Sequence, residues 1–274
     1  MTVHPSLQNS IDAWTHSIDA ISELVNPLAE SEWNRATECP GWSVRDVVSH
    51  VIGLECEMLG DPRPIHPLPR DLFHVTSELS RYMEVQVDVR RCHTAPEMTS
   101  ELEYTVIRRN RQLRNEKRAP DAKVRWPGGG EVTLEEALTR RAFDTWVHEQ
   151  DLRRALNQPG NLDSPGASIT RDVLLAALPK VVAKDAGAAP HSAVVLDVSG
   201  PLEFMRTVRV DADGRGTIDG SVSLGPTVTF TLDWETYVRL ACGRVRPEAV
   251  SDRLKIEGDQ QLAEAILAHF AITP

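Results

Sequence analysis

Two stretches of the sequence place metal-binding types of side chain on the apolar side of predicted helices. His50 follows Val47 and precedes Leu54 at helical spacing, so its imidazole shares a face with apolar side chains and needs a polar partner. Asp144 and His148 stand at positions i and i+4, about one helical turn apart, and therefore project from the same face. A carboxylate buried on such a face is costly unless it is paired or bound to a metal.

Each of these observations also has a simpler interpretation. A lone histidine on an apolar helix face is more often a satisfied core residue than a ligand. Asp144 and His148 are equally consistent with a buried ion pair that Arg141 joins from the preceding turn. Taken together, however, two nitrogens and one oxygen from facing helices of a bundle suit a divalent metal, and zinc is the metal that we expect. Three protein ligands leave one position open, as in catalytic zinc sites, and Asp151 could orient an imidazole from behind.

The elements that must position these residues are helical in the first half of the chain. Ser43 with Asp46, and Thr133 with Glu136, form capping-box-like pairs that open two of the helices. Apolar residues then recur at spacings of three and four. The predicted helices cover residues 6–28, 43–59, about 71–91, about 96–118 and 133–156. Helices with connections this short predict an up-down bundle.

The second half changes character after Asn157-Gln158-Pro159-Gly160, which predicts a linker. A helix over about 167–185 precedes short, β-branched, nearly alternating stretches. The predicted strands are Ala193–Val198, Thr207–Val210, Thr227–Leu232 and about 254–257, with helices starting near Asp233 and Asp259. Helices with antiparallel strands make this half α+β, so we expect two domains, residues 1–160 and 161–274.

Composition limits the classes of protein to which the chain can belong. With 274 residues, 41% of them hydrophobic, it has the composition of a globular protein, and its net charge of −10 argues against broad nucleic-acid binding. The arginine-rich run over 108–118 could bind an anion, but a solvated helix face is the favoured interpretation. No stretch approaches the roughly 20 apolar residues of a membrane span, and the N-terminus lacks a signal-peptide pattern. A cytoplasmic protein without a membrane partner is expected.

Two motifs resemble the signatures of the mycothiol-dependent maleylpyruvate isomerase family. The first is Thr37–His50, read as Thr-Glu-Cys-Pro-Gly-Trp-Ser-Val-Arg-Asp-Val-Val-Ser-His, and the second is Arg141–Leu152. The resemblance covers nearly the whole chain. It implies an N-terminal DinB-like four-helix bundle followed by a smaller α+β domain that resembles sterol-carrier proteins. The family's zinc ligands correspond by position to His50, Asp144 and His148.

The resemblance also extends to the C-terminal half and includes one departure. Thr229–Trp234, Gly243-Arg244 and Glu257–Asp259 are similar in layout to the family's smaller domain. The family's catalytic arginine follows a glycine there, which implies that Arg244 contacts a substrate anion. The alternative is a helix-end arginine near a C-cap glycine. The isomerases carry glutamate where Asp144 stands, so the shorter side chain must bring the metal closer to the helix or hold it more weakly.

The resemblance implies a zinc-dependent enzyme, or one using another divalent metal, with mycothiol or a similar low-molecular-weight thiol as co-substrate. The reaction would be isomerisation or S-transfer on a small electrophilic substrate. One alternative is a zinc hydrolase in which Glu149 is a candidate general base. Another is a non-catalytic protein whose second domain binds a small molecule or lipid. Cys39 is interpreted as an inert apolar residue rather than a nucleophile.

Overall fold

The chain divides into two compact units. The computed structural model describes residues 3–221 and 225–273. Unit one, Met1–Ile169, is helical, and unit two, Thr170–Pro274, combines helices with a sheet, which confirms the predicted fold class. The division falls inside helix α6 (Pro165–Lys180), whereas the sequence placed a domain boundary after residue 160. Among the described residues, no helix is both long and apolar enough to cross a bilayer.

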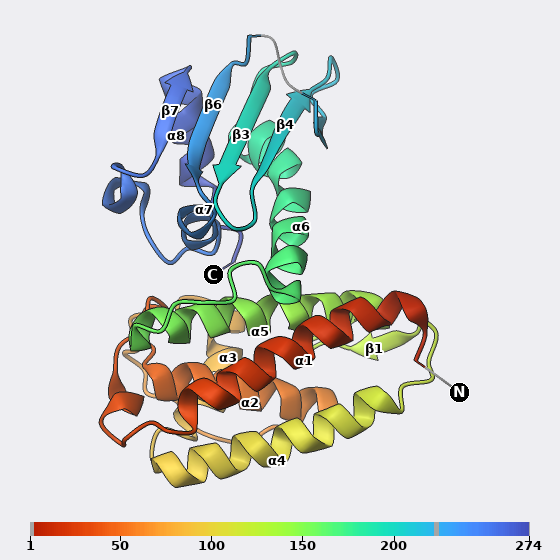
Figure 1. Cartoon of the computed structure of the whole chain (residues 1–274), viewed down its shortest axis with the longest axis vertical. Helices are drawn as coiled ribbons and strands as arrows, with labels where there is room; N and C mark the ends of the chain where they lie inside the picture. The colour runs from red at the N-terminus through yellow and green to blue at the C-terminus, as the bar shows by residue number, and fades with distance from the viewer. Residues whose placement is uncertain (1–2, 222–224, 274) are drawn as a thin grey trace. The chain divides into compact units, whose positions relative to one another are not determined.

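The N-terminal unit is a bundle built around four long helices (Figure 1). Helix α1 packs along α5, and α2 contacts α3, α4 and α5. A short antiparallel hairpin, which the sequence analysis did not predict, connects α4 to α5. The elements are α1 (Pro5–Val25), η1 (Glu32–Asn34), α2 (Val44–Leu59), α3 (Glu78–Asp88), α4 (Ala95–Arg114), β1 (Lys123–Arg125), β2 (Glu131–Thr133) and α5 (Leu134–Leu156).

The helices that carry the candidate ligands begin at the predicted caps. Before α2, the Ser43 hydroxyl accepts from the Asp46 backbone N–H, and the Asp46 carboxylate accepts from the Ser43 N–H at 2.8 Å. Before α5, Thr133 Oγ1 accepts from the Glu136 N–H at 3.1 Å. The side chain of Glu136 pairs with Arg140 on the exposed surface, so only half of the second predicted capping box forms.

Three predicted helices are shorter than the sequence pattern indicated, and one of them, α4, ends at Arg114 rather than near residue 118. Helix α1 ends at Val25, with Asn26 as its C-cap, because Pro27 has no backbone N–H with which to continue the helical hydrogen bonds. The helix predicted over 71–91 begins only at α3, where Ser77 and Ser80 form a reciprocal capping box. The segment between α2 and α3 is otherwise irregular.

The carboxylate of Glu55, on α2, lies at the centre of the bundle and binds side chains from the three other long helices. Its Oε1 accepts from Trp14 Nε1 of α1 at 2.9 Å and from Arg141 Nε and Nη2 of α5 at 2.9 and 2.7 Å. Its Oε2 accepts from Arg109 Nε of α4 at 2.9 Å. All four side chains are buried.

The buried Glu55 is held in its ionised form. Burial alone would raise its pKa, but the positive charges of Arg141 and Arg109, with their hydrogen bonds, outweigh burial and lower the pKa below its ordinary value. The sequence interpretation of the run 108–118 as a solvated face is therefore wrong for Arg109, which is 3% exposed. The same interpretation holds for Arg108, whose guanidinium pairs with Asp61 at 2.7 and 2.6 Å and is partly exposed to solvent.

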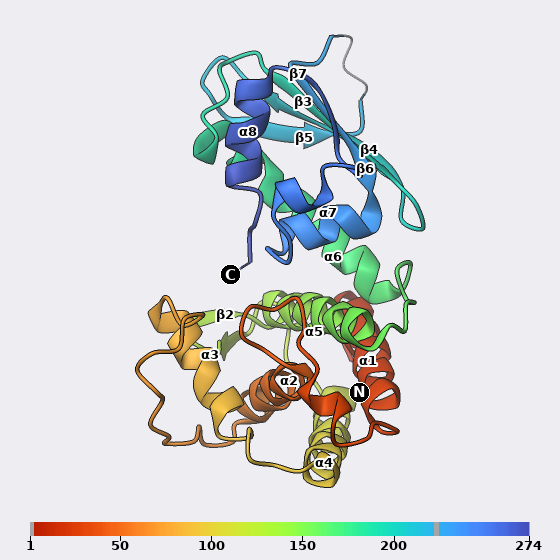
Figure 2. The same cartoon turned by 90° about the vertical axis from the view of Figure 1, so that its left-hand side faces the viewer.

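The C-terminal unit is built on a five-stranded sheet of order β5-β4-β3-β6-β7. Strands β3 and β6 run parallel, and the other neighbouring strands are antiparallel. Helices α7 and α8 pack against β6 (Figure 2). The elements after α6 are η2 (Val181–Asp185), β3 (Ala193–Ser199), β4 (Phe204–Val210), β5 (Gly216–Asp219), β6 (Val228–Asp233), α7 (Trp234–Ala241), η3 (Pro247–Val250), β7 (Lys255–Gly258) and α8 (Gln260–Ala268). The parallel pair and β5 were not predicted.

We expect Glu55→Gln to destabilise the protein strongly. The substitution keeps the size of the side chain but leaves Arg109 buried without its counter-charge and Arg141 with Asp144 alone, which costs on the order of 3–5 kcal/mol. Urea unfolding followed by circular dichroism measures this loss. Glu136→Gln, which breaks an exposed pair with Arg140, is the matched control and should change the free energy of unfolding by less than about 1 kcal/mol. Equal effects of the two substitutions would contradict the central role of Glu55.

Candidate metal centre

Helices α2 and α5 bring the three residues singled out in the sequence into one cluster. His50 Nε2 lies 3.5 Å from Asp144 Oδ2, and His148 Nε2 lies 3.6 Å from Asp144 Oδ1. The two imidazole rings are 4.8 Å apart between centroids. One donor atom from each residue lies within 4.8 Å of the other two. The spacing of Asp144 and His148 follows from one helical turn, and the position of His50 follows from the packing of α2 against α5.

The chemistry of this cluster fits a metal ion better than a closed hydrogen-bonded core. Both ring nitrogens of His50 are buried and lack a hydrogen-bond partner among the described residues, which is unusual for buried polar atoms. The contacts of Asp144 with the two imidazoles are longer than good hydrogen bonds. Burial lowers the pKa of His50, although Asp144 acts in the opposite direction. The imidazole is thus kept in the neutral form that coordinates metals.

Arg141 holds the carboxylate of the cluster in place and in its charged form. Its Nη1 donates to Asp144 Oδ2 at 2.6 Å, while its Nε and Nη2 donate to Glu55. Burial alone would raise the pKa of Asp144, but Arg141 and then the two histidines lower it well below its ordinary value. Of the buried ion pair that the sequence offered as the alternative to a metal site, the contact of Arg141 with Asp144 is short and the contact of His148 with Asp144 is 3.6 Å. The contact with Arg141 orients the carboxylate.

Trp42 covers the two imidazoles, and sequence reasoning had not assigned it a role. Its ring lies 5.0 Å from the ring of His50 and 6.1 Å from that of His148, between centroids. Its Nε1 donates to Glu84 Oε2 at 3.0 Å, and the same oxygen lies 3.0 Å from His74 Nε2. Trp42 belongs to the first signature, so the motif positions an aromatic wall as well as a ligand.

Gly41 allows this wall to form. Its φ of +77° lies in the left-handed region, and a Cβ at this position would meet His74 Nδ1 at 2.3 Å. The backbone turn before Trp42 and the close approach of His74 both require a residue without a side chain.

Two other residues discussed for function are not among the three residues of this cluster. Glu149 is buried, and its Oε1 accepts from Arg153 Nε and Asn161 Nδ2, each at 2.7 Å. Its Oε2 is buried and has no hydrogen-bond partner among the described residues, and Glu149 does not belong to the group of candidate ligands. Arg244 belongs to the C-terminal unit, follows Gly243 with its positive φ, and donates from Nη1 to the carbonyl oxygen of Cys242 at 2.6 Å. Its role in substrate binding stays a prediction.

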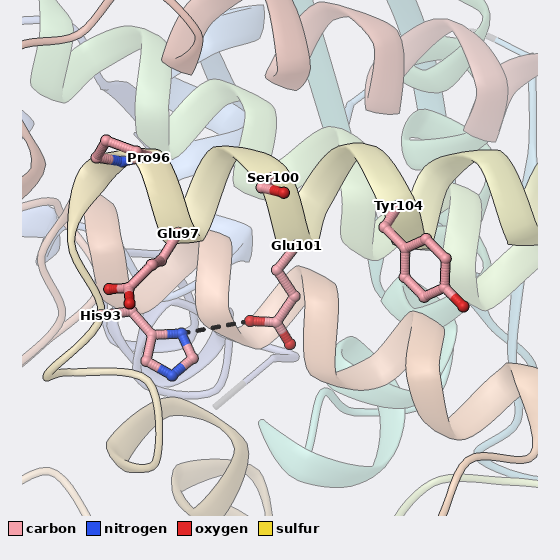
Figure 3. Close-up of a pocket in the computed structure, with 6 residues that line it drawn as sticks. All are labelled: His93, Pro96, Glu97, Ser100, Glu101 and Tyr104. Carbon is pink, nitrogen blue, oxygen red and sulfur yellow. Dashed lines mark ion pairs between the residues drawn. The ribbon is translucent and has the colours of Figure 1, made fainter.

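A pocket at the N-terminal half of α4 does not offer a comparable set of ligands (Figure 3). The Glu97 carboxylate caps the helix, accepting from the Thr94 N–H at 2.7 Å and its hydroxyl at 2.8 Å. Glu101 Oε1 accepts from Arg90 Nε and Nη2 at 3.0 and 2.8 Å, and Oε2 lies 3.4 Å from His93 Nδ1. These carboxylates already have partners, so the cluster between α2 and α5 is the stronger candidate. The pocket is lined by His93, Pro96, Glu97, Ser100, Glu101 and Tyr104.

Comparison with known proteins identifies related sequences and folds. Residues 14–153 match the family described as the mycothiol maleylpyruvate isomerase N-terminal domain, and residues 168–265 match its C-terminal domain. The crystal structure of the mycothiol-dependent maleylpyruvate isomerase is similar with a TM-score of 0.58 and 16% identity, covering 94% of this chain and 96% of that one. A histidine-to-alanine mutant of that enzyme gives a TM-score of 0.57 over the same shares of the two chains, also at 16% identity.

A partial match is found to sterol carrier protein 2 like 2 from Aedes aegypti. It has 16% identity and a TM-score of 0.30, and it covers 37% of this chain and 97% of that one. No curated protein matches the sequence.

We expect Gly41→Ala to cost more stability than the same change at a comparable glycine. Gly60 has a similar φ of +87°, but a Cβ there would meet nothing within 4 Å. Gly60→Ala should therefore lose only the roughly 1–2 kcal/mol of left-handed backbone strain, whereas Gly41→Ala adds a clash with His74 worth about 1–3 kcal/mol. Urea unfolding of the two variants measures the difference, and equal losses would show that His74 moves away without cost.

Proposed function

The chain belongs to the mycothiol maleylpyruvate isomerase family, and from this we propose that it is a zinc-dependent enzyme that uses mycothiol, or a similar low-molecular-weight thiol. The reaction is isomerisation or S-transfer on a small electrophilic substrate. The observation that carries the proposal is the buried cluster of His50, Asp144 and His148, in which the nitrogens of His50 have no hydrogen-bond partner among the described residues.

The proposed metal ligands are His50, Asp144 and His148. Two imidazole nitrogens and a carboxylate oxygen are a ligand set that suits zinc, and three protein ligands leave a position for a further ligand. When bound, zinc lowers the pKa of a thiol ligand and so supplies a thiolate nucleophile at neutral pH. Other divalent metals bind the same donor atoms. We propose zinc because of the ligand set, and the family match itself does not identify the metal.

The surrounding residues prepare the cluster for this role. Arg141 keeps Asp144 ionised and fixes one of its oxygens. Burial keeps His50 neutral. The indole of Trp42 covers the two imidazoles and thereby limits the access of water to them. In the C-terminal unit, Arg244 is proposed to bind a carboxylate of the substrate, because it follows a glycine as the family's catalytic arginine does.

The first test is the metal content of the protein purified without a chelator or an affinity metal. We expect about one zinc per chain in the wild type and little in His50→Ala, since the variant loses one of three ligands. His66→Ala is the matched control, because His66 also pairs with an aspartate, Asp88, but lies outside the cluster. Plasma mass spectrometry of the three proteins measures the ratio of zinc to protein.

Absence of metal from the wild type, even after zinc is added, would contradict the proposal. Asp144 and His148 would then be structural, and binding of a small molecule or lipid without catalysis would become the better interpretation. The hydrolase alternative has less support, because Glu149 is fully buried, its Oε1 is held by Arg153 and Asn161, and it does not belong to the group of candidate ligands.

A second test concerns Arg244. In a thiol-dependent assay with a carboxylated substrate, Arg244→Ala should lower kcat/KM by about 10–100-fold, the effect of losing a charge-assisted hydrogen bond of about 1.5–3 kcal/mol. Arg246→Ala, at an exposed neighbouring position, should leave kcat/KM unchanged. Unchanged kinetics for Arg244→Ala would remove this residue from the site. Turnover in the absence of any thiol would instead favour hydrolysis.

A further inference from the structure

The two ring nitrogens of His148 have different surroundings. Nε2 faces Asp144 Oδ1 at 3.6 Å, which is too long for a good hydrogen bond. Nδ1 lies 3.1 Å from Asp151 Oδ2, one helical turn along α5. One edge of the imidazole is thus held by the protein, and the other edge faces the cluster with Asp144 and His50.

Asp151 is itself fixed from several directions. It is 0% exposed. Its Oδ1 accepts from Arg154 Nη2 at 2.6 Å, and Arg154 Nε lies 2.7 Å from Glu38 Oε2. Its Oδ2 accepts from the thiol of Cys39 at 3.0 Å as well as from His148. A carboxylate with an arginine on one oxygen and two donors on the other is a rigid acceptor.

This arrangement determines which nitrogen of His148 carries the proton. An ionised carboxylate can only accept hydrogen bonds, so the contact with Asp151 requires the proton on Nδ1. Nε2 then presents its lone pair to the cluster. A metal-binding histidine whose other nitrogen donates to a carboxylate is fixed both in tautomer and in ring orientation.

We propose that Asp151 is the positioning residue of the metal centre, and that the thiol of Cys39 supports it by donating to the same oxygen. The inference rests on the proposed function, because it assigns His148 Nε2 to the metal. It also gives Cys39 a role other than that of a nucleophile. A thiol that donates a hydrogen bond to a neighbouring carboxylate keeps its proton and is not a thiolate.

Cys39, His148 and Asp151 could themselves be taken for a second metal site, since their donor atoms lie within 4.8 Å of one another. Their geometry favours hydrogen bonding. The contacts of Asp151 Oδ2 with the thiol and with the imidazole are 3.0 and 3.1 Å, ordinary hydrogen-bond lengths. The cluster around His50 differs, because its contacts are longer and the nitrogens of His50 are unsatisfied within the described chain.

The tautomer of His148 can be measured in the metal-free protein. Long-range proton–nitrogen correlation spectra of histidine-labelled protein distinguish the two neutral forms, and a His148→Gln sample identifies the signals. We expect wild-type His148 to carry its proton on Nδ1 and Asp151→Ala to populate the other tautomer as well. A wild-type signal with the proton on Nε2, or no change in Asp151→Ala, would overturn the inference.

Zinc affinity provides the second readout, by competition with a chromophoric chelator. Asp151→Ala should weaken zinc binding by about 10–100-fold, the usual effect of losing the outer partner of a ligand. Asp151→Asn retains an acceptor oxygen and should fall between the alanine variant and the wild type. Cys39→Ala should weaken zinc binding less than Asp151→Ala does. Cys39→Ser should keep the wild-type affinity, because a hydroxyl also donates a hydrogen bond. Asp88→Ala, at the separate pair with His66, is the control and should leave affinity unchanged.

The outcomes separate this inference from the proposed function. If His50→Ala retains zinc, the metal site is wrong, whereas the tautomer measurement still decides whether Asp151 holds His148. If His50→Ala loses zinc but Asp151→Ala alters neither tautomer nor affinity, only the positioning role is wrong. Two zinc ions per chain, one of them lost in Cys39→Ala, would make Cys39 a ligand and overturn the inference. If Asp151→Ala does not fold, Asp151→Asn and Cys39→Ala make the same comparisons.

Discussion

The helical unit depends on one buried carboxylate. Glu55 is the acceptor for an indole and two guanidinium groups, and these come from the three other long helices. Two buried arginines against one glutamate would leave an excess positive charge, and the second carboxylate, Asp144, balances it. The polar core therefore consists of alternating charges, Arg109–Glu55–Arg141–Asp144, which continue from the middle of the bundle to the candidate metal centre. Such networks are stable only when every member is satisfied.

This network explains why the centre is rigid on one side and open on the other. Asp144 is fixed by Arg141, and His148 is fixed by Asp151. The facing edges of the imidazoles and the carboxylate are joined by longer contacts, 3.5 Å from His50 Nε2 to Asp144 Oδ2 and 3.6 Å from His148 Nε2 to Asp144 Oδ1. A metal or substrate site requires side chains that are already held in position. Here folding itself brings the two imidazoles and the carboxylate together, so binding does not have to order them.

The sequence predicted the features that depend on local spacing. Asp144 and His148 had to share a face because they are one turn apart, and capping residues located the starts of α2 and α5. It could not predict that His50 would face them, since this depends on how two helices pack. Glu55 was missed because a single glutamate in an amphipathic helix usually lies at the surface. Arg109 was misread because its sequence neighbours are solvated arginines, and only tertiary packing distinguishes it from them.

The two partners of Arg141 affect which substitutions at Asp144 the protein can tolerate in evolution. Arg141 divides its hydrogen bonds between Glu55, which holds the helices together, and Asp144, which belongs to the candidate metal centre. Replacing Asp144 with a neutral residue would leave a buried guanidinium partly unpaired, so the change would be selected against even in a chain that had lost its catalytic activity. Charge balance in the core would thus favour an acidic residue at this position whether or not it binds a metal. The persistence of such a residue among related chains is, for this reason, a weaker indicator of catalysis than the persistence of His50, on which the bundle does not depend for charge balance.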